Sequence, residues 1–101
     1  CHGYCGLLNT RLSDGSLLLD GREITGFSWL EEKLVLVDKL VPYDVEEQSR
    51  QRGAVYRKAT LPFAPFTVTD GTLVTGQNPA SAKGTAERVA ELLAPRVHGG
   101  A

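Results

Sequence analysis

Short apolar runs alternate with helical patterns along the sequence, and this alternation restricts the fold more than any other feature. The strand-like runs lie at residues 16–19, 22–25, 54–59, 66–69 and 72–75, and the helical patterns lie at 4–8, 28–41, 45–52 and from 78 onward. Strands that alternate with helices indicate a layered α/β fold. No linker rich in Pro, Gly or Ser divides the sequence, so we treat residues 1–101 as one domain or part of one.

Capping residues mark where two of these helices begin and end. Ser28, with Glu31 three residues later, forms a capping box at the start of the first. Pro42 limits that helix because it cannot continue the hydrogen-bond ladder. Asp44 is placed to cap the next helix, and Gly53 suits the position just after its end.

Two helices carry an apolar stripe, which predicts the face that each one buries. In the helix after Ser28, the stripe consists of Leu30, Leu34, Val37 and Val41. The last helix is expected to begin with Asn78 as its cap and Pro79 in its first turn, and Pro95 and the Gly99-Gly100 tail are expected to close it. Its stripe consists of Ala82, Ala86, Val89 and Leu93.

Two Asp-Gly pairs each lie between strand-like runs, which is a signal for a tight hairpin. Asp20-Gly21 predicts that the run at 16–19 pairs with a return strand, Arg22–Thr25. Asp70-Gly71 predicts a second hairpin between the two runs that flank it.

Composition narrows the class of protein further. Eleven Lys and Arg against twelve Asp and Glu leave a formal charge of −1, which argues against a nucleic-acid partner. We expect no membrane-spanning helix and no secretory signal, because the apolar runs are short and none follows a basic segment at the start. Two cysteines form no disulfide framework. These features favour a reducing compartment, and we expect a cytoplasmic protein.

The tripeptide Cys1-His2-Gly3 is the strongest candidate for chemistry. A thiolate is a good nucleophile, and a neighbouring imidazole can take its proton or move one on the substrate. The alternative is a buried small cysteine beside an ordinary surface histidine. A position just before a helix favours the thiolate, because a helix N-terminus stabilises negative charge.

A Cys/His pair needs a third group to orient the imidazole. Glu31 and Glu32 are the candidates, although both can equally be solvated carboxylates in the first turn of a helix. The capping box uses Glu31, which leaves Glu32 freer for this role.

Cys5 is interpreted as a small core residue, because two cysteines on one helical turn make a poor disulfide. A metal site is not expected. Cys1, Cys5 and His2 lack a fourth ligand and the CxxC spacing of zinc sites.

Six segments together resemble the ThiJ/PfpI superfamily, which is similar to the class I glutamine amidotransferases. They are Cys1-His2-Gly3, Leu12-Ser13-Asp14-Gly15, Ile24-Thr25-Gly26-Phe27-Ser28, Val41-Pro42-Tyr43, Gly53-Ala54-Val55-Tyr56, and Leu73-Val74-Thr75-Gly76-Gln77-Asn78-Pro79-Ala80-Ser81. The segments at 24–28 and 73–81 resemble the branch of glutathione-independent glyoxalases and heat-shock chaperones. The resemblance implies a flavodoxin-like three-layer α/β sandwich, of which residues 1–101 are the C-terminal portion.

The same resemblance implies a site and an activity. Cys1 would be the nucleophile on a strand-to-helix elbow, His2 the catalytic base, and Glu32 the acid that orients it. The implied reaction is a cofactor-free, glyoxalase III-like conversion of a small reactive aldehyde such as methylglyoxal or glyoxal. The alternatives are a stress chaperone, a redox sensor in which Cys1 oxidises, and a cysteine peptidase or amidase.

The chain also departs from the family pattern. The N-terminal half of the domain, with a glutamate that touches the nucleophilic sulfur in the family, is absent and is expected to complete the pocket. Tyr4 and Cys5 stand where relatives often have Pro and Ala, and Trp29-Leu30 replaces acidic or polar residues. The resemblance further implies a homodimer.

Overall fold

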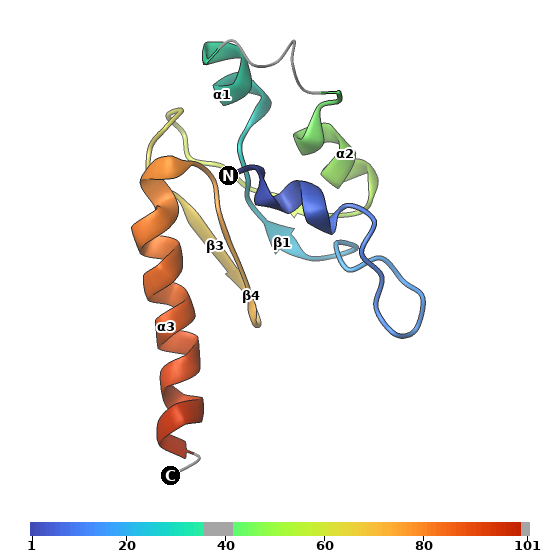
Figure 1. The fold of residues 1–101 in the computed structure, drawn as a ribbon. Helices are drawn as coiled ribbons and strands as arrows, with labels where there is room; N and C mark the ends of the chain where they lie inside the picture. The colour runs from blue at the N-terminus through green and yellow to red at the C-terminus, as the bar shows by residue number, and fades with distance from the viewer. Residues whose placement is uncertain (36–41, 100–101) are drawn as a thin grey trace.

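The computed structural model describes residues 1–35 and 42–99, which form a mixture of short strands and helices (Figure 1). In chain order the elements are η1 (His2–Leu7), β1 (Glu23–Ile24), α1 (Trp29–Leu34), α2 (Val45–Gln51), β2 (Val55–Tyr56), β3 (Thr67–Asp70), β4 (Leu73–Gly76), η2 (Pro79–Ser81) and α3 (Ala82–Gly99). The α/β class predicted from the sequence is therefore confirmed. Within the described ranges, no helix is long and apolar enough to cross a membrane.

The strands form two small sheets that lie side by side. β3 and β4 pair in antiparallel fashion around Asp70-Gly71, as predicted, and Gly71 has a φ of 61° in the turn. Arg22, just before β1, joins the two sheets because its Nε donates to Asp70 Oδ2 over 3.1 Å. The same oxygen accepts the backbone N–H of Glu23 at 2.9 Å, and these donors lower the pKa of Asp70.

The predicted hairpin at Asp20-Gly21 is wrong. The return strand exists as β1, but it pairs in parallel with β2, with Glu23 opposite Val55. The turn directs the chain away from residues 16–19, because the N–H of Gly21 donates to the carbonyl of Gly53 at 2.9 Å. A contact 32 positions along the chain thus replaces the local pairing, and no short-range signal encodes such a contact.

The caps of α1 and α2 confirm their predictions. The Ser28 side chain accepts from the Glu31 N–H, and the Glu31 side chain accepts from the Ser28 N–H, which completes the capping box. The Asp44 side chain accepts from the Glu47 N–H at the start of α2. Gly53, just beyond α2, has a φ of 89°, a conformation that favours glycine.

The buried face predicted for α1 is wrong. Leu30 and Leu34 are 49% and 55% exposed, whereas Glu31 and Glu32 are buried. The remaining stripe residues, Val37 and Val41, lie outside the described residues. Burial of two carboxylates is feasible here because each is hydrogen-bonded, as described below, which offsets the cost of removing it from water.

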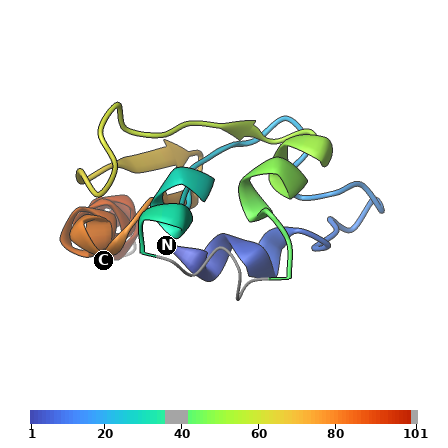
Figure 2. The same cartoon turned by 90° about the horizontal axis from the view of Figure 1, so that it is seen from above.

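The buried stripe predicted for α3 is also wrong, since Val89 and Leu93 are 42% and 48% exposed and Ala82 and Ala86 are exposed as well. Figures 1 and 2 place α3 beside the β3–β4 hairpin, with its C-terminal part extending past the hairpin. The helix meets the sheet through a different, small and polar face: Thr85 lies against Gly76, and Arg88 Nε donates to Thr69 Oγ1 at 3.2 Å. The helix continues through Pro95 and ends at Gly99, the first of the two glycines that were expected, together with Pro95, to close it.

The apolar core lies between η1, β1, α2 and the segment that leads into β2. Its buried members are Tyr4, Leu8, Leu19, Ile24, Val45 and Ala54. The predicted helix after Gly3 is present, as a 3₁₀-helix rather than an α-helix; it supplies Tyr4, and Leu8 caps its C-terminal end. Tyr4 donates its hydroxyl to the Phe27 carbonyl at 2.6 Å, and burial raises its pKa far above the usual value.

Gly26 is required by this packing. A Cβ atom on Gly26 would overlap the ring of Tyr4. We expect Gly26→Ala to lower the free energy of unfolding by about 1–3 kcal/mol, as overpacking in cores does. Chemical denaturation of the full-length protein measures this loss. Gly6→Ala is the matched control, because a Cβ there meets nothing within 4 Å. Equal losses for the two variants would contradict the prediction.

Candidate active site

Cys1 is held where the ends of two strands meet. Its backbone nitrogen donates to the carbonyl of Gly76, the last residue of β4, at 2.7 Å. Its own carbonyl accepts the N–H of Phe27, in the segment between β1 and α1, at 2.8 Å. These two bonds fix the backbone of Cys1 at the start of η1, while its side chain stays exposed. The thiol is therefore both positioned and accessible.

His2 connects Cys1 to Glu32. The Sγ atom of Cys1 lies 3.3 Å from Nδ1 of His2, and the opposite ring nitrogen, Nε2, hydrogen-bonds to Oε1 of Glu32. The imidazole is half-exposed and the carboxylate is buried. When Nε2–H donates to Glu32, Nδ1 is left as an acceptor that faces the thiol. Sulfur, imidazole and carboxylate are thus connected in series, so the imidazole can take the thiol proton while the carboxylate holds its other nitrogen.

The two candidate glutamates point in different directions. Consecutive residues of an α-helix are about 100° apart, so only one of two neighbours can face His2. Glu32 does so, and its second oxygen, Oε2, is buried without a hydrogen-bond partner among the described residues. Of the two alternatives that the sequence left open, the structure places Glu32 beside the imidazole.

Glu31 instead lies at the centre of a buried hydrogen-bond network. Its Oε1 accepts from the Ser28 N–H, the Ser28 hydroxyl and Gln77 Nε2 at 2.7–3.0 Å. Its Oε2 accepts from the Phe63 N–H at 2.7 Å and from Asn78 Nδ2 at 2.9 Å. Burial acts to raise the pKa of Glu31, but the hydrogen bonds from the backbone of Ser28 and Phe63 and from the side chains of Gln77 and Asn78 outweigh it and hold the pKa below the usual value. The side chain of Asn78, which the sequence predicted as a helix cap, thus hydrogen-bonds to Glu31.

Two phenylalanines extend the site beyond the residues that the sequence suggested. The Phe27 ring lies 4.7 Å from the His2 ring, centroid to centroid. The Phe63 ring packs edge-on against Phe27 at 5.8 Å. Phe27 lies between β1 and α1, and Phe63 lies between β2 and β3. An apolar residue in a connecting segment carries no distinctive signal, which is why neither was predicted as a site residue.

A cavity of about 280 Å³ opens beside Cys1. It is lined by Cys1, Tyr4, Leu7, Thr25 and the residues of β4. The Thr25 hydroxyl is buried and has no hydrogen-bond partner in the described part of the chain. The space is large enough for a small substrate next to the thiol. Tyr4 lines this cavity, but its side chain is packed in the apolar core. Tyr4 therefore forms a fixed part of the cavity lining.

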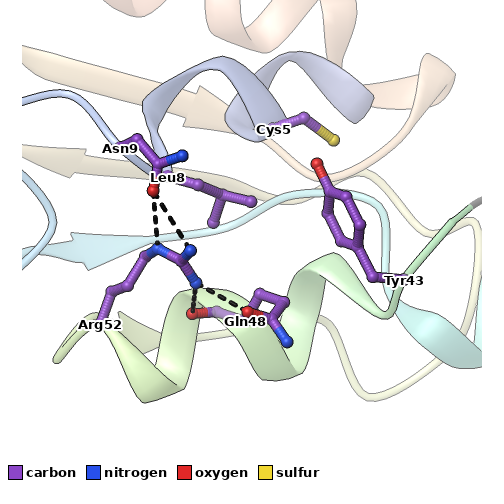
Figure 3. Close-up of a pocket in the computed structure, with 6 residues that line it drawn as sticks. All are labelled: Cys5, Leu8, Asn9, Tyr43, Gln48 and Arg52. Carbon is purple, nitrogen blue, oxygen red and sulfur yellow. Dashed lines mark hydrogen bonds between the residues drawn. The ribbon is translucent and has the colours of Figure 1, made fainter.

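Cys5 faces a separate cavity of about 270 Å³ between η1 and α2 (Figure 3). In the close-up, the hydroxyl of Tyr43 points toward the Cys5 sulfur, and Arg52 closes the far end through hydrogen bonds to Asn9 and Gln48. Cys5 is half-buried and packs against the core, in keeping with its predicted structural role. Burial, and to a smaller extent the charge of Glu32, raises the pKa of the Cys5 thiol.

This difference between the thiols predicts selective alkylation. At pH 7 we expect iodoacetamide to modify Cys1 well before Cys5, because the raised pKa keeps Cys5 protonated and only the thiolate reacts. Labelling of Cys5 should rise only as the pH moves above the usual thiol range. Peptide mapping by mass spectrometry over time measures both rates. Equal rates at pH 7 would contradict the assignment.

Among the side chains that the structure describes, in residues 1–35 and 42–94, no three from His, Cys, Asp or Glu are grouped so that they could hold a metal ion. Of the departures from the family pattern, Trp29 is half-buried, with the Lys33 ammonium 6.0 Å from its ring, and Leu30 faces outward. Neither contributes to the lining of the Cys1 cavity.

The fold and the site together define a class: an α/β protein in which an exposed cysteine is coupled through the adjacent histidine to a buried glutamate. The chain is 37% identical over 100 residues to glutathione-independent glyoxalase HSP31 of Saccharomyces cerevisiae, covering 92% of this chain and 41% of that protein. It is 38% identical over 96 residues to Glyoxalase 3 of Candida albicans, covering 88% and 40%. The chain thus spans about two fifths of the length of these relatives.

Solved structures show a likeness to the same group of proteins. The crystal structure of glyoxalase III from Candida albicans matches with a TM-score of 0.80 at 35% identity, over 91% of this chain and 41% of that one. Rapid Encystment Protein 24 KDa of Francisella tularensis matches with a TM-score of 0.87 at 33% identity, over 92% and 41%. No protein-family model matches the chain. These likenesses are consistent with the family resemblance drawn from the sequence motifs.

Proposed function

We propose that the protein containing this chain converts a small 2-oxoaldehyde, such as methylglyoxal, to the corresponding 2-hydroxy acid without glutathione or another cofactor. The observation that carries the proposal is the contact path from Cys1 Sγ through the His2 ring to Glu32. The glyoxalase names of the relatives support the same reaction.

In the first step, His2 Nδ1 takes the thiol proton of Cys1, and the sulfur attacks the aldehyde carbon. A carbon–sulfur bond forms, the carbonyl electron pair moves to oxygen, and that oxygen takes up the proton. The product is a hemithioacetal. The distance of 3.3 Å between Sγ and Nδ1 suits this proton transfer before substrate tightens the contact.

In the second step, the imidazole moves a proton between neighbouring carbons. It removes the hydrogen from the former aldehyde carbon and gives an enediol, and a proton then returns to the former ketone carbon. The first carbon is oxidised and the second is reduced, so no external redox partner is needed. The resulting thioester is hydrolysed by water, which releases lactate and regenerates the Cys1 thiol.

Glu32 acts on the imidazole rather than on the substrate. By accepting from Nε2, it keeps Nδ1 directed at the sulfur and stabilises the imidazolium that forms in each proton transfer. Its burial strengthens this effect, because a low dielectric weakens electrostatic interactions less than water does.

We also propose that residues 1–101 are the C-terminal portion of a flavodoxin-like domain. The greater length of the relatives supports this. The apolar faces left open on α1 and α3, at Leu30, Leu34, Val89 and Leu93, are surfaces on which further layers of such a domain would pack. A homodimer and a cytoplasmic location stay predictions.

The test is the formation of lactate from methylglyoxal by the full-length protein in the absence of glutathione. We expect turnover that is independent of added metal or nucleotide. A folded, reduced protein that forms no lactate would overturn the proposal and would favour another substrate of a nucleophilic cysteine.

A further inference from the structure

Phe63 has an unusual backbone conformation. Its φ of 62° lies in the left-handed region, and in the described parts of the chain it is the one residue other than glycine that does so. A bulky side chain disfavours this region, so neighbouring groups must hold the backbone there. Such positions are concentrated at functional sites.

The groups that hold Phe63 belong to the Glu31 network. The Phe63 N–H donates to Glu31 Oε2 at 2.7 Å. Asn78 Nδ2 bridges the same oxygen, at 2.9 Å, to the carbonyl of Ala64, at 2.7 Å. The strained residue and its successor are thus both tied to one buried carboxylate on α1.

The Phe63 side chain connects this constrained backbone to the candidate active site through ring contacts. Its ring packs against Phe27, and Phe27, only 5% exposed, packs against the His2 imidazole. The three rings form a column with His2 at one end. Glu32, next to Glu31 in the same helical turn, holds Nε2 of the same imidazole.

We propose that Glu31 and Phe63 are positioning residues for His2. Glu31 fixes the first turn of α1, and with it Glu32, while it also holds the backbone of Phe63 so that the column of rings supports the imidazole. The buried carboxylate of Glu31 therefore positions both Glu32 and the imidazole of His2 that Glu32 contacts. The inference rests on the proposed role of His2 in proton transfer.

The consequence is a loss of alignment when the column is broken. An imidazole that lacks support from Phe27 can leave the geometry in which it contacts Cys1 and Glu32 together. Small displacements of a catalytic group reduce the rate of the chemical step by up to about a hundredfold while substrate binding changes little. We therefore expect kcat to fall by about tenfold to a hundredfold with KM within about threefold.

Phe63→Gly separates this role from a contribution to stability. The variant removes the ring but relieves the strained backbone, because glycine readily adopts positive φ. We expect a protein that melts no earlier than the wild type and yet has the reduced kcat. Phe63→Tyr, which restores the ring, should recover the activity lost in Phe63→Gly. A Phe63→Gly variant with wild-type kcat would overturn the inference.

Glu31→Gln tests the other end of the network. Its amide nitrogen would face groups that are themselves donors, so the bonds to Phe63 or to Ser28 and Gln77 must break. Glu46→Gln is the matched control, because Glu46 is also a buried glutamate. The carboxamide oxygen can still accept from the Trp29 N–H at the start of α1, and only the ion pair with Arg50 on α2 is lost. We expect loss of kcat in the first variant and not in the second. Equal effects would indicate a general cost of changing buried charge and would overturn the inference.

A second readout is independent of turnover. The alkylation rate of Cys1 by iodoacetamide at pH 7, followed by peptide mapping, reports how well His2 activates the thiol. Phe63→Gly should lower this rate in the wild-type background but not in a Glu32→Gln background, where the imidazole is already misplaced. An unchanged rate in the wild-type background overturns the inference. If that rate falls but wild-type protein forms no lactate, the positioning role stands and the proposed glyoxalase activity fails.

Discussion

Replacing Cys1 by alanine is expected to reduce lactate formation from methylglyoxal by about a thousandfold or more, because no other group can form the thioester intermediate. Cys1 is exposed, lies 3.3 Å from the His2 ring and opens into the cavity. The side chain makes no core contact that folding requires, so the melting temperature of the variant should stay close to that of the wild type. Initial rates of lactate formation measure the effect.

Cys5→Ser is the matched control for this experiment. Cys5 faces the other cavity, so its replacement should leave the rate within about threefold of the wild type. Retention of activity in Cys1→Ala, or equal losses in both cysteine variants, would contradict the assignment of the nucleophile. A holding assay on an aggregating client protein, run on the same variants, distinguishes a chaperone, which should not depend on Cys1.

Replacing Glu32 by glutamine is expected to lower kcat by about a hundredfold to ten-thousandfold, with a smaller effect on KM. The carboxamide has no charge to stabilise the imidazolium, and it can present an N–H to Nε2 and so favour the wrong tautomer. Steady-state kinetics with methylglyoxal measure both parameters.

Glu23→Gln is the control for the loss of a carboxylate. Glu23 is half-exposed on β1, where it pairs with Arg57 at 3.5 Å, away from the site. We expect it to keep wild-type kinetics. If Glu32→Gln also keeps wild-type kinetics, the buried contact to His2 has no catalytic role. The proposed role of Glu32 in orienting the imidazole would then be contradicted.

Local signals predicted the elements that depend on neighbouring residues. The capping box of Ser28 and Glu31, the cap at Asp44 and the hairpin at Asp70-Gly71 are each set by a few consecutive positions. The adjacency of Cys1 and His2 is likewise visible in the sequence. The capping box, because it uses Glu31, left Glu32 freer for the third role, and the family resemblance implied Glu32. The structure brings these three side chains together, which a sequence pattern alone could only suggest.

Local signals could not predict contacts between segments that lie far apart in the sequence. The parallel pairing of β1 with β2 depends on residues far along the chain, so the Asp20-Gly21 turn predicted the wrong partner for β1. Leu30 and Leu34 of α1, and Val89 and Leu93 of α3, are exposed because the described part of the chain has no layer over them. Glu31 satisfies its capping box and also binds Phe63 and Asn78, two segments that its own sequence context does not reveal.

The adjacent carboxylates of α1 place a strict limit on how this segment can change in length. Because each helical residue turns the chain by about 100°, one residue inserted or deleted between Ser28 and Glu32 would rotate the network carboxylate toward the imidazole, or carry both away from it. Substitution is far less restricted, since Leu30 and Lys33 are exposed. In related sequences that share this site, we expect the residues around the two glutamates to differ freely while the spacing from the helix cap stays fixed.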